Sequence, residues 1–171
     1  MEFKILIDRK ENDKYIIQQL NKFTKIERKG LLFGDYIAEV NTLTVPVIIK
    51  RLSNYEDFLN VLLDPTKDIN NNNRFFKGFK RAYSNKNEII LLVEDEKFYK
   101  KLFSGSMRNQ VIKLETLYPN LKIVPISKKI TSQYIYLVLY YRAKKYINHN
   151  KSWWNITPYR GTDIIKSYIT F

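Results

Sequence analysis

Short apolar runs of strand length, separated by segments with helical spacing, set the strongest limit on how this 171-residue chain can fold. The runs are KILID at residues 4–8, VPVIIK at 45–50, EIILLV at 88–93 and LKIVPI at 121–126. Helical patterns cover residues 13–23, 55–63, 74–83, 96–103, 107–118 and 131–147. Strands that alternate with helices in this way predict an α/β fold whose mixed or parallel central sheet is flanked by helices on both faces.

The segment between residues 12 and 50 predicts further structure around the first strand. Asn12 or Asp13 can cap the first helix, because a side-chain oxygen there accepts free backbone N–H groups. Residues 25–32 predict a second strand, followed by Gly34-Asp35. Residues 36–40 and 45–50 then predict a β-hairpin with the turn NTLT at 41–44.

The length of the chain favours one domain with an appended tail. Residues 1–148 carry the strand and helix patterns and are predicted to form the α/β domain. The pattern changes after Asn148, so residues 149–171, which contain two Trp, are predicted to be a tail that packs on the domain or on a partner.

The charge balance favours a polyanionic partner. The chain has 30 basic and 17 acidic residues, a formal net charge of +13, which favours nucleic acid through counterion release. An acidic protein surface, or a surface that only keeps the chain soluble, remains an alternative. The absence of Cys excludes thiolate chemistry, and the single His, His149, excludes a His-based metal cluster. The charged first residues and the absence of a membrane-length apolar run predict a cytoplasmic protein without a signal peptide.

Three carboxylates near predicted strand ends point to metal-assisted phosphodiester cleavage. Asp8 ends one strand, Glu11 follows it closely, and Asp35 opens the hairpin after a glycine that allows close backbone approach. Carboxylates from separate strands can converge on Mg²⁺ or Mn²⁺, and Asp8 and Asp35 are the predicted metal ligands. Glu39, two pleats further along the strand from Asp35, is an alternative ligand.

At these positions the sequence resembles the nuclease domain of XPF-type structure-specific endonucleases, including their stand-alone phage and bacterial relatives. The family's Asp-x-Arg-Glu segment reads Asp8-Arg9-Lys10-Glu11 here, and its Gly-Asp reads Gly34-Asp35. A basic aromatic helix, RFFKGFKRAY, then precedes the strand EIILLV in the family's order. The resemblance covers residues 3–148 and implies a restriction-endonuclease-like, or PD-(D/E)XK, nuclease fold; it is also compatible with a homodimer.

The resemblance fails at the family's third element, a strand that ends in Glu-Arg-Lys. One alignment places Ile49 at the position of the glutamate, and the other places Lys50 there and Leu52 at the position of the lysine. Both alignments lose the carboxylate. A literal Glu27-Arg28-Lys29 precedes Gly34-Asp35, in the wrong order for the family, and is interpreted as surface charge.

The sequence supports two hypotheses for the function. The first is a catalytically impaired nuclease-like protein that binds RNA, DNA or a nucleoprotein, with a counter-defence role of the anti-CRISPR kind in a phage or mobile element. The second is an active Mg²⁺- or Mn²⁺-dependent endonuclease on branched or single-stranded DNA. The candidate catalytic residues, vestigial or weak in the first case, are Asp8, Glu11, Asp35, Lys50 and Arg51. The candidate nucleic-acid contacts are Lys10, Arg74, Lys77, Lys80 and Arg81.

Overall fold

The fold is built on one six-stranded mixed sheet. The structure is a computed structural model that describes residues 2–62, 74–95, 98 and 105–154. The strands are β1 (Phe3–Asp8), β2 (Lys25–Lys29), β3 (Tyr36–Val40), β4 (Leu43–Leu52), β5 (Glu88–Val93) and β6 (Leu121–Pro125), in the order β2-β1-β3-β4-β5-β6. The β1–β3 and β3–β4 pairs are antiparallel and the other pairs are parallel. The predicted α/β class with a mixed central sheet is therefore confirmed.

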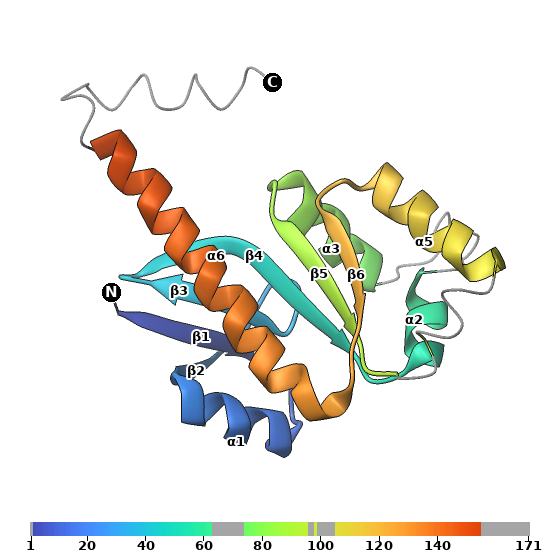
Figure 1. The fold of residues 1–171 in the computed structure, drawn as a ribbon, viewed down its shortest axis with the longest axis horizontal. Helices are drawn as coiled ribbons and strands as arrows, with labels where there is room; N and C mark the ends of the chain where they lie inside the picture. The colour runs from blue at the N-terminus through green and yellow to red at the C-terminus, as the bar shows by residue number, and fades with distance from the viewer. Residues whose placement is uncertain (1, 63–73, 96–97, 99–104, 155–171) are drawn as a thin grey trace.

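Helices cover both faces of this sheet. They are α1 (Lys14–Phe23), α2 (Tyr55–Leu62), α3 (Arg74–Ser84), α5 (Gly105–Leu117) and α6 (Thr131–Trp154), and the 3₁₀ turn η2 (Lys128–Ile130) precedes α6. Figure 1 shows α6 crossing one face diagonally next to α1, with α3 behind the sheet. One apolar core contains Ile16, Leu20, Ile135 and Leu139 from α1 and α6, and a second contains Phe58, Phe79 and Val111 from α2, α3 and α5. The two cores fix which face each strand residue occupies.

The N-terminal elements follow local signals closely, with one difference. Asp13 caps α1, since its Oδ1 accepts the backbone N–H groups of Tyr15 and Ile16 at 3.1 and 3.2 Å. The predicted strand 25–32 is too long, because β2 ends at Lys29. The chain leaves the sheet there, and the backbone N–H of Leu31 donates to Asp8 Oδ2 at 2.8 Å instead of to a strand.

The hairpin turn is tighter than the predicted four-residue turn. Asn41 and Thr42 have φ angles of 47° and 70°, and β4 already begins at Leu43. Two residues with positive φ match the twist of the flanking strands, which is why two-residue turns of this kind are favoured in hairpins. The prediction of a turn over 41–44 is wrong in its length.

The C-terminal helix is longer than predicted. The helix α6 continues past residue 147 to Trp154 and so crosses the predicted boundary at residue 148. Residues 148–154 contain no Pro or Gly, the two residues that most strongly disfavour a helix. Residues 155–171 of the predicted tail, the Asn-rich segment at 67–73, for which the sequence predicts a loop, and most of the predicted helix at 96–103 lie outside the described residues.

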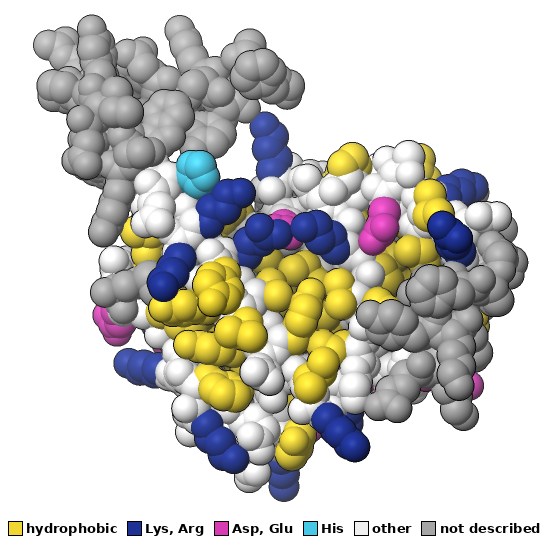
Figure 2. All heavy atoms as spheres, in the orientation of Figure 1, with side chains coloured by type: hydrophobic (Ala, Val, Ile, Leu, Met, Phe, Trp, Pro, Cys, Tyr) yellow, Lys and Arg dark blue, Asp and Glu magenta, His cyan; other side chains and the backbone are white. Residues whose placement is uncertain are grey.

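The face that α6 crosses also carries an exposed apolar area. Figure 2 shows hydrophobic side chains gathered in the middle of this face with Lys and Arg beside them. Leu137 and Tyr141 of α6 are 38% and 63% exposed, and they line a hollow with Lys122 and Arg142. Exposed apolar areas of this kind often mark interaction surfaces. None of the helices in the described part of the chain combines the length and apolar character needed to cross a membrane.

Candidate active site

The central strands bring Asp8, Asp35 and Lys50 to neighbouring positions. In the strand register, Ile7 lies opposite Tyr36 and Tyr36 lies opposite Ile49. Asp8 and Asp35 are the next pair beyond Ile7 and Tyr36, and Lys50, which follows Ile49 on β4, reaches Asp35 through its side chain. The backbone N–H of Asp8 donates to the carbonyl of Asp35 at 2.9 Å. Because directly opposite residues share a face of a sheet, these three side chains form one row.

Gly34 makes this close arrangement of strands sterically allowed. Its φ is +81°, which L side chains rarely adopt. A Cβ atom at Gly34 would lie 2.2 Å from Ile48 Cγ2 and 3.0 Å from the carbonyl oxygen of Ile49. The backbone of Asp35, the next residue, donates its N–H to that same carbonyl at 2.8 Å. The glycine therefore positions Asp35 against β4, as the sequence indicated.

An ion pair with Lys50 occupies one oxygen of Asp35. Lys50 Nζ lies 2.8 Å from Asp35 Oδ1, and the backbone N–H of Arg51 donates to Oδ2 at 2.7 Å. Burial raises the pKa of Asp35 above its ordinary value, and the contacts with Lys50 and the Arg51 N–H oppose this only in part. Ile49 is fully buried in the core beneath α6, on the other face of β4. Lys50, not Ile49, therefore faces Asp35.

Backbone groups hold the Asp8 carboxylate. The N–H of Lys10 donates to Asp8 Oδ1 at 2.9 Å, and the N–H of Leu31 donates to Oδ2 at 2.8 Å. Asp8 is 8% exposed, as is Asp35. Both carboxylates are thus oriented by the protein itself and lie next to each other across β1 and β3.

Glu11 forms a bidentate contact with Arg51, the residue that follows Lys50 on β4. Arg51 Nη2 and Nε donate to Glu11 Oε1 and Oε2 at 2.9 and 3.1 Å. Tyr36 also donates its hydroxyl to Glu11 Oε2 at 2.9 Å. Burial raises the pKa of Glu11, but the hydrogen bonds and charge of Arg51 outweigh it, so the pKa lies below its ordinary value. Glu11 is therefore an ionised partner of Arg51 in this arrangement.

Two further carboxylates, which the sequence did not suggest as site residues, complete the surroundings of Arg51. Glu94 Oε2 and Asp13 Oδ2 lie 2.9 and 3.4 Å from Arg51 Nη1. Lys128 contacts Asp13 Oδ2 at 3.0 Å. Glu94 Oε1 is buried without a hydrogen-bond partner among the described residues. Glu94 directly follows the apolar strand β5 as Asp8 ends β1, and a carboxylate at a strand end was the signal that could have identified it.

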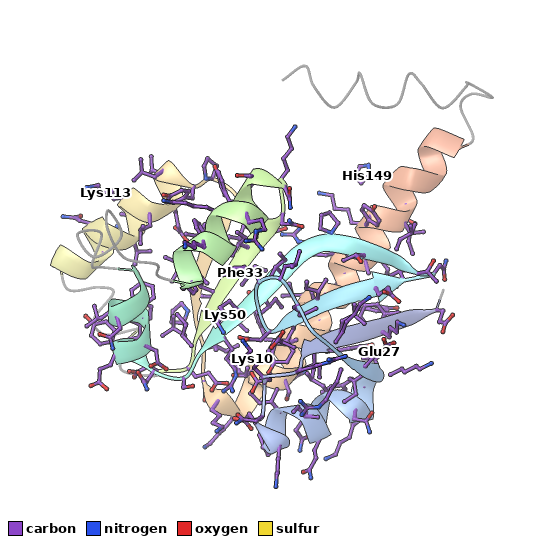
Figure 3. The ribbon with its side chains drawn as sticks, turned by 180° about the vertical axis from the view of Figure 1, so that it is seen from behind. Lys10, Glu27, Phe33, Lys50, Lys113 and His149 are labelled. Carbon is purple, nitrogen blue, oxygen red and sulfur yellow. The ribbon has the colours of Figure 1, made fainter. Side chains whose placement is uncertain are left out.

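The predicted nucleic-acid contacts fall into two groups. Lys10 is exposed beside Asp8, whose Oδ1 accepts its backbone N–H, and Figure 3 shows it well away from Lys113 and His149. Arg74 begins α3, and three exposed cations follow on that helix: Lys77, Lys80 and Arg81. Arg81 also lines a pocket together with residues 29–33. Arg81 is therefore linked to the surroundings of Asp8 through this pocket, because Leu31 both lines the pocket and donates its backbone N–H to Asp8.

Comparison with known proteins identifies the fold. No family model matches the sequence, and no curated protein matches it. Among solved structures, XPF from Aeropyrum pernix matches with a TM-score of 0.54 at 19% sequence identity. The chain has an XPF-like nuclease fold. The match covers 79% of this chain and 64% of that chain, so this chain spans less than two thirds of its neighbour's length.

The donor set in this XPF-like fold does not fit a divalent cation. Within residues 2–62, 74–95, 98 and 105–154, no group of three or more His, Cys, Asp or Glu side chains is arranged to hold a metal ion. Lys50 places an ammonium group against Asp35, where Mg²⁺ or Mn²⁺ would need free oxygens. Glu39 offers no replacement, because it lies towards the far end of β3 and pairs with Lys4 at 2.8 Å.

Proposed function

We propose that this chain is a catalytically impaired, nuclease-like protein that binds nucleic acid or a nucleoprotein. One observation carries the proposal: Lys50 occupies the position opposite Asp35, with its ammonium group 2.8 Å from Asp35 Oδ1. In the XPF-type motif, the strand that pairs here supplies a glutamate followed by arginine and lysine. This contact, together with the burial of Ile49 on the other face of β4, supports the alignment in which Lys50 replaces that glutamate and Arg51 retains the arginine.

The exchange of a carboxylate for an ammonium group reverses the charge that the metal requires. A weakly held Mg²⁺ depends on carboxylate oxygens, and phosphoryl transfer depends on positioning and electrostatic stabilisation by the metal. Misplacing a catalytic group alone costs about a hundredfold in rate. In this chain the carboxylate oxygens of Asp8 and Asp35 instead accept hydrogen bonds from backbone N–H groups and from Lys50. Partners from the protein itself therefore engage these oxygens, and we infer that little cleavage activity remains.

The binding part of the function rests on charge and on the fold. The formal charge of +13 favours phosphates. Lys10 lies beside Asp8, and Arg81 lines a pocket that also contains Leu31, a hydrogen-bond donor to Asp8. An inactive nuclease scaffold of this size suits a counter-defence protein in the cytoplasm of an infected bacterium, acting on a guide RNA or its effector. A homodimer through the apolar area on α6 is compatible with this role.

Cleavage assays test the loss of activity. Purified protein incubated with supercoiled, forked and single-stranded DNA in Mg²⁺ or Mn²⁺ is expected to leave all three intact, because Lys50 opposes metal binding at Asp35. Product formation is followed on denaturing gels, with Asp35→Ala as the control. Cutting by the wild type that disappears in Asp35→Ala would contradict the proposal and favour an active metal-dependent endonuclease.

Binding assays test the nucleic-acid partner. The affinity for single-stranded DNA or RNA is expected to fall about a hundredfold between 50 and 200 mM salt if roughly five phosphates are contacted, because each contact releases a counterion. Fluorescence anisotropy with labelled oligonucleotides measures this slope. Affinity that is undetectable, or unchanged by salt, would point to an acidic protein partner instead.

A further inference from the structure

A pocket opens beside Asp8 on the face of the sheet opposite α6. Its volume is about 260 Å³, and its floor is formed by Leu6, Ile37 and Ile48 from β1, β3 and β4. The loop at residues 30–33 forms one wall, and α3 forms the other. Most ligand pockets combine such an apolar floor with a few polar groups at the rim.

The two walls meet because α3 has a glycine where it approaches the loop. A Cβ atom at Gly78 would lie 2.7 Å from Phe33 Cδ2, a distance that the rigid ring could not accommodate without moving. Phe33 is 9% exposed, packs its ring edge-on against Phe75 at 5.3 Å, and lines the pocket. The aromatic ring of Phe33 therefore forms part of the pocket wall, and its packing against α3 fixes its position.

The charges around the pocket are of one sign. Among the described residues that line it, Lys29 from the end of β2 and Arg81 from α3 are charged, and none is Asp or Glu. Neither of these cations forms an ion pair with another described residue. Asn85 and Asn87, just beyond α3, also line the pocket, and the Asn87 side chain donates from Nδ2 to the Ala82 carbonyl at 2.9 Å, which holds that side chain against α3. Apolar walls with polar amides and two cations match a flat, hydrogen-bonding group attached to an anion.

The pocket adjoins the carboxylate row. Leu31, in the pocket wall, donates its backbone N–H to Asp8 Oδ2, and Lys29 lies opposite Asp8 in the β1–β2 register. A polynucleotide strand seated here would therefore pass along the edge where XPF-like nucleases carry their motif. This continuity favours nucleic acid over an unrelated small molecule.

We propose that this pocket takes one unstacked base of single-stranded nucleic acid, with the adjoining phosphates on Lys29 and Arg81. Bases of a single strand can leave the stack and pack against aromatic side chains, and basic grooves follow the backbone. Bases inside an intact duplex are not available in this way. This proposal rests on the proposed binding of nucleic acid and adds that the single-stranded form is recognised.

The first experiment separates base recognition from phosphate binding. Labelled single-stranded DNA and RNA oligonucleotides are compared with oligonucleotides of equal length and charge that carry abasic sites throughout. The wild type is expected to bind the natural strands about tenfold more tightly, because one base is stacked. Equal affinity for natural and abasic strands would overturn the pocket while leaving nucleic-acid binding intact, whereas no binding of either would overturn both.

Substitutions that narrow the pocket test whether the base binds there. Ala82→Leu and Thr44→Leu each narrow the pocket, the second from an exposed position on β4 that requires no change in the core. Both are expected to remove the preference for natural bases and to leave binding of abasic strands unchanged. Retention of that preference in a folded Thr44→Leu variant, as judged by its melting curve, would overturn the assignment.

A second pair of variants tests the phosphate contacts. Arg81→Gln is expected to weaken binding of natural and abasic strands equally, by several-fold, and to reduce the salt slope by about one contact. Lys113→Gln removes the same charge from α5, far from Phe33 in Figure 3, and should have a much smaller effect. Equal effects of the two substitutions would show that Arg81 acts only through net charge and would overturn its role in the pocket.

Discussion

Arg51→Met is expected to lower the free energy of unfolding by about 3–5 kcal/mol, because it leaves buried carboxylates without their cation. The Arg51 side chain is 10% exposed, and those of Glu11 and Glu94 are 5% and 2% exposed. Both oxygens of Glu11 and one oxygen of Glu94 accept hydrogen bonds from the guanidinium group. Urea unfolding followed by circular dichroism measures the change.

Lys4→Met is the matched control for this substitution. Lys4 also contacts two carboxylates, Glu27 at 2.6 Å and Glu39 at 2.8 Å, but its side chain is 20% exposed and that of Glu27 is 46% exposed. Solvent-exposed ion pairs contribute little to stability, so its loss should be clearly smaller than that of Arg51→Met. Equal losses would indicate that Arg51 stabilises the fold only by packing.

The effect of Arg51→Met should depend on pH in a defined direction. Glu11 has a folded-state pKa below its ordinary value of 4.5, because the contacts with Arg51 outweigh the effect of burial. A lowered pKa contributes stability that is fully present above the unfolded-state pKa and is lost as pH falls through the folded-state pKa. The difference between wild type and variant is therefore expected to be full at pH 7 and to shrink below about pH 4.5.

Lys50→Glu is expected to create a metal site that the wild type lacks. The substitution places a third carboxylate in the row of Asp8 and Asp35, where like charges destabilise the protein until a cation binds. Mn²⁺ at a hundred times its dissociation constant should then raise stability by about 2.7 kcal/mol. For a domain of this size, that corresponds to a rise of about 5–10 °C in the melting temperature.

Thermal melting with and without Mn²⁺ measures this gain, and EDTA should reverse it. Lys50→Gln removes the ammonium group without adding a carboxylate and should show no comparable rise. Adding Asp35→Asn to Lys50→Glu should abolish the rise, because a ligand is removed. A rise that survives Asp35→Asn would place the metal elsewhere and contradict the assignment of Lys50 to the third position. Any cleavage gained by Lys50→Glu can be measured on the same forked DNA.

Much of the fold follows from local patterns. Buried strands such as β5 appear in the sequence as continuous apolar runs, because both of their faces are covered. The cap at Asp13 and the close approach at Gly34 could be predicted because side-chain hydrogen bonding and the lack of a Cβ atom act locally. The lengths of β2 and of the hairpin turn were not predicted. They depend on Leu31 bonding to Asp8, 23 residues earlier, and on the twist of paired strands.

The sequence by itself determined an α/β chain with carboxylates at Asp8, Glu11 and Asp35 and with Lys50 or Ile49 in place of another. It could not choose between those two residues, because a shift of one residue exchanges the faces of a strand and only pairing with β3 fixes the register. It also could not show that Arg51 is surrounded by Glu11 and Asp13, from the connection between β1 and α1, and by Glu94, which follows β5. Only the tertiary structure brings these charged groups together. Burying a charged side chain is costly unless an opposite charge lies beside it, and here the opposite charges come from distant parts of the sequence.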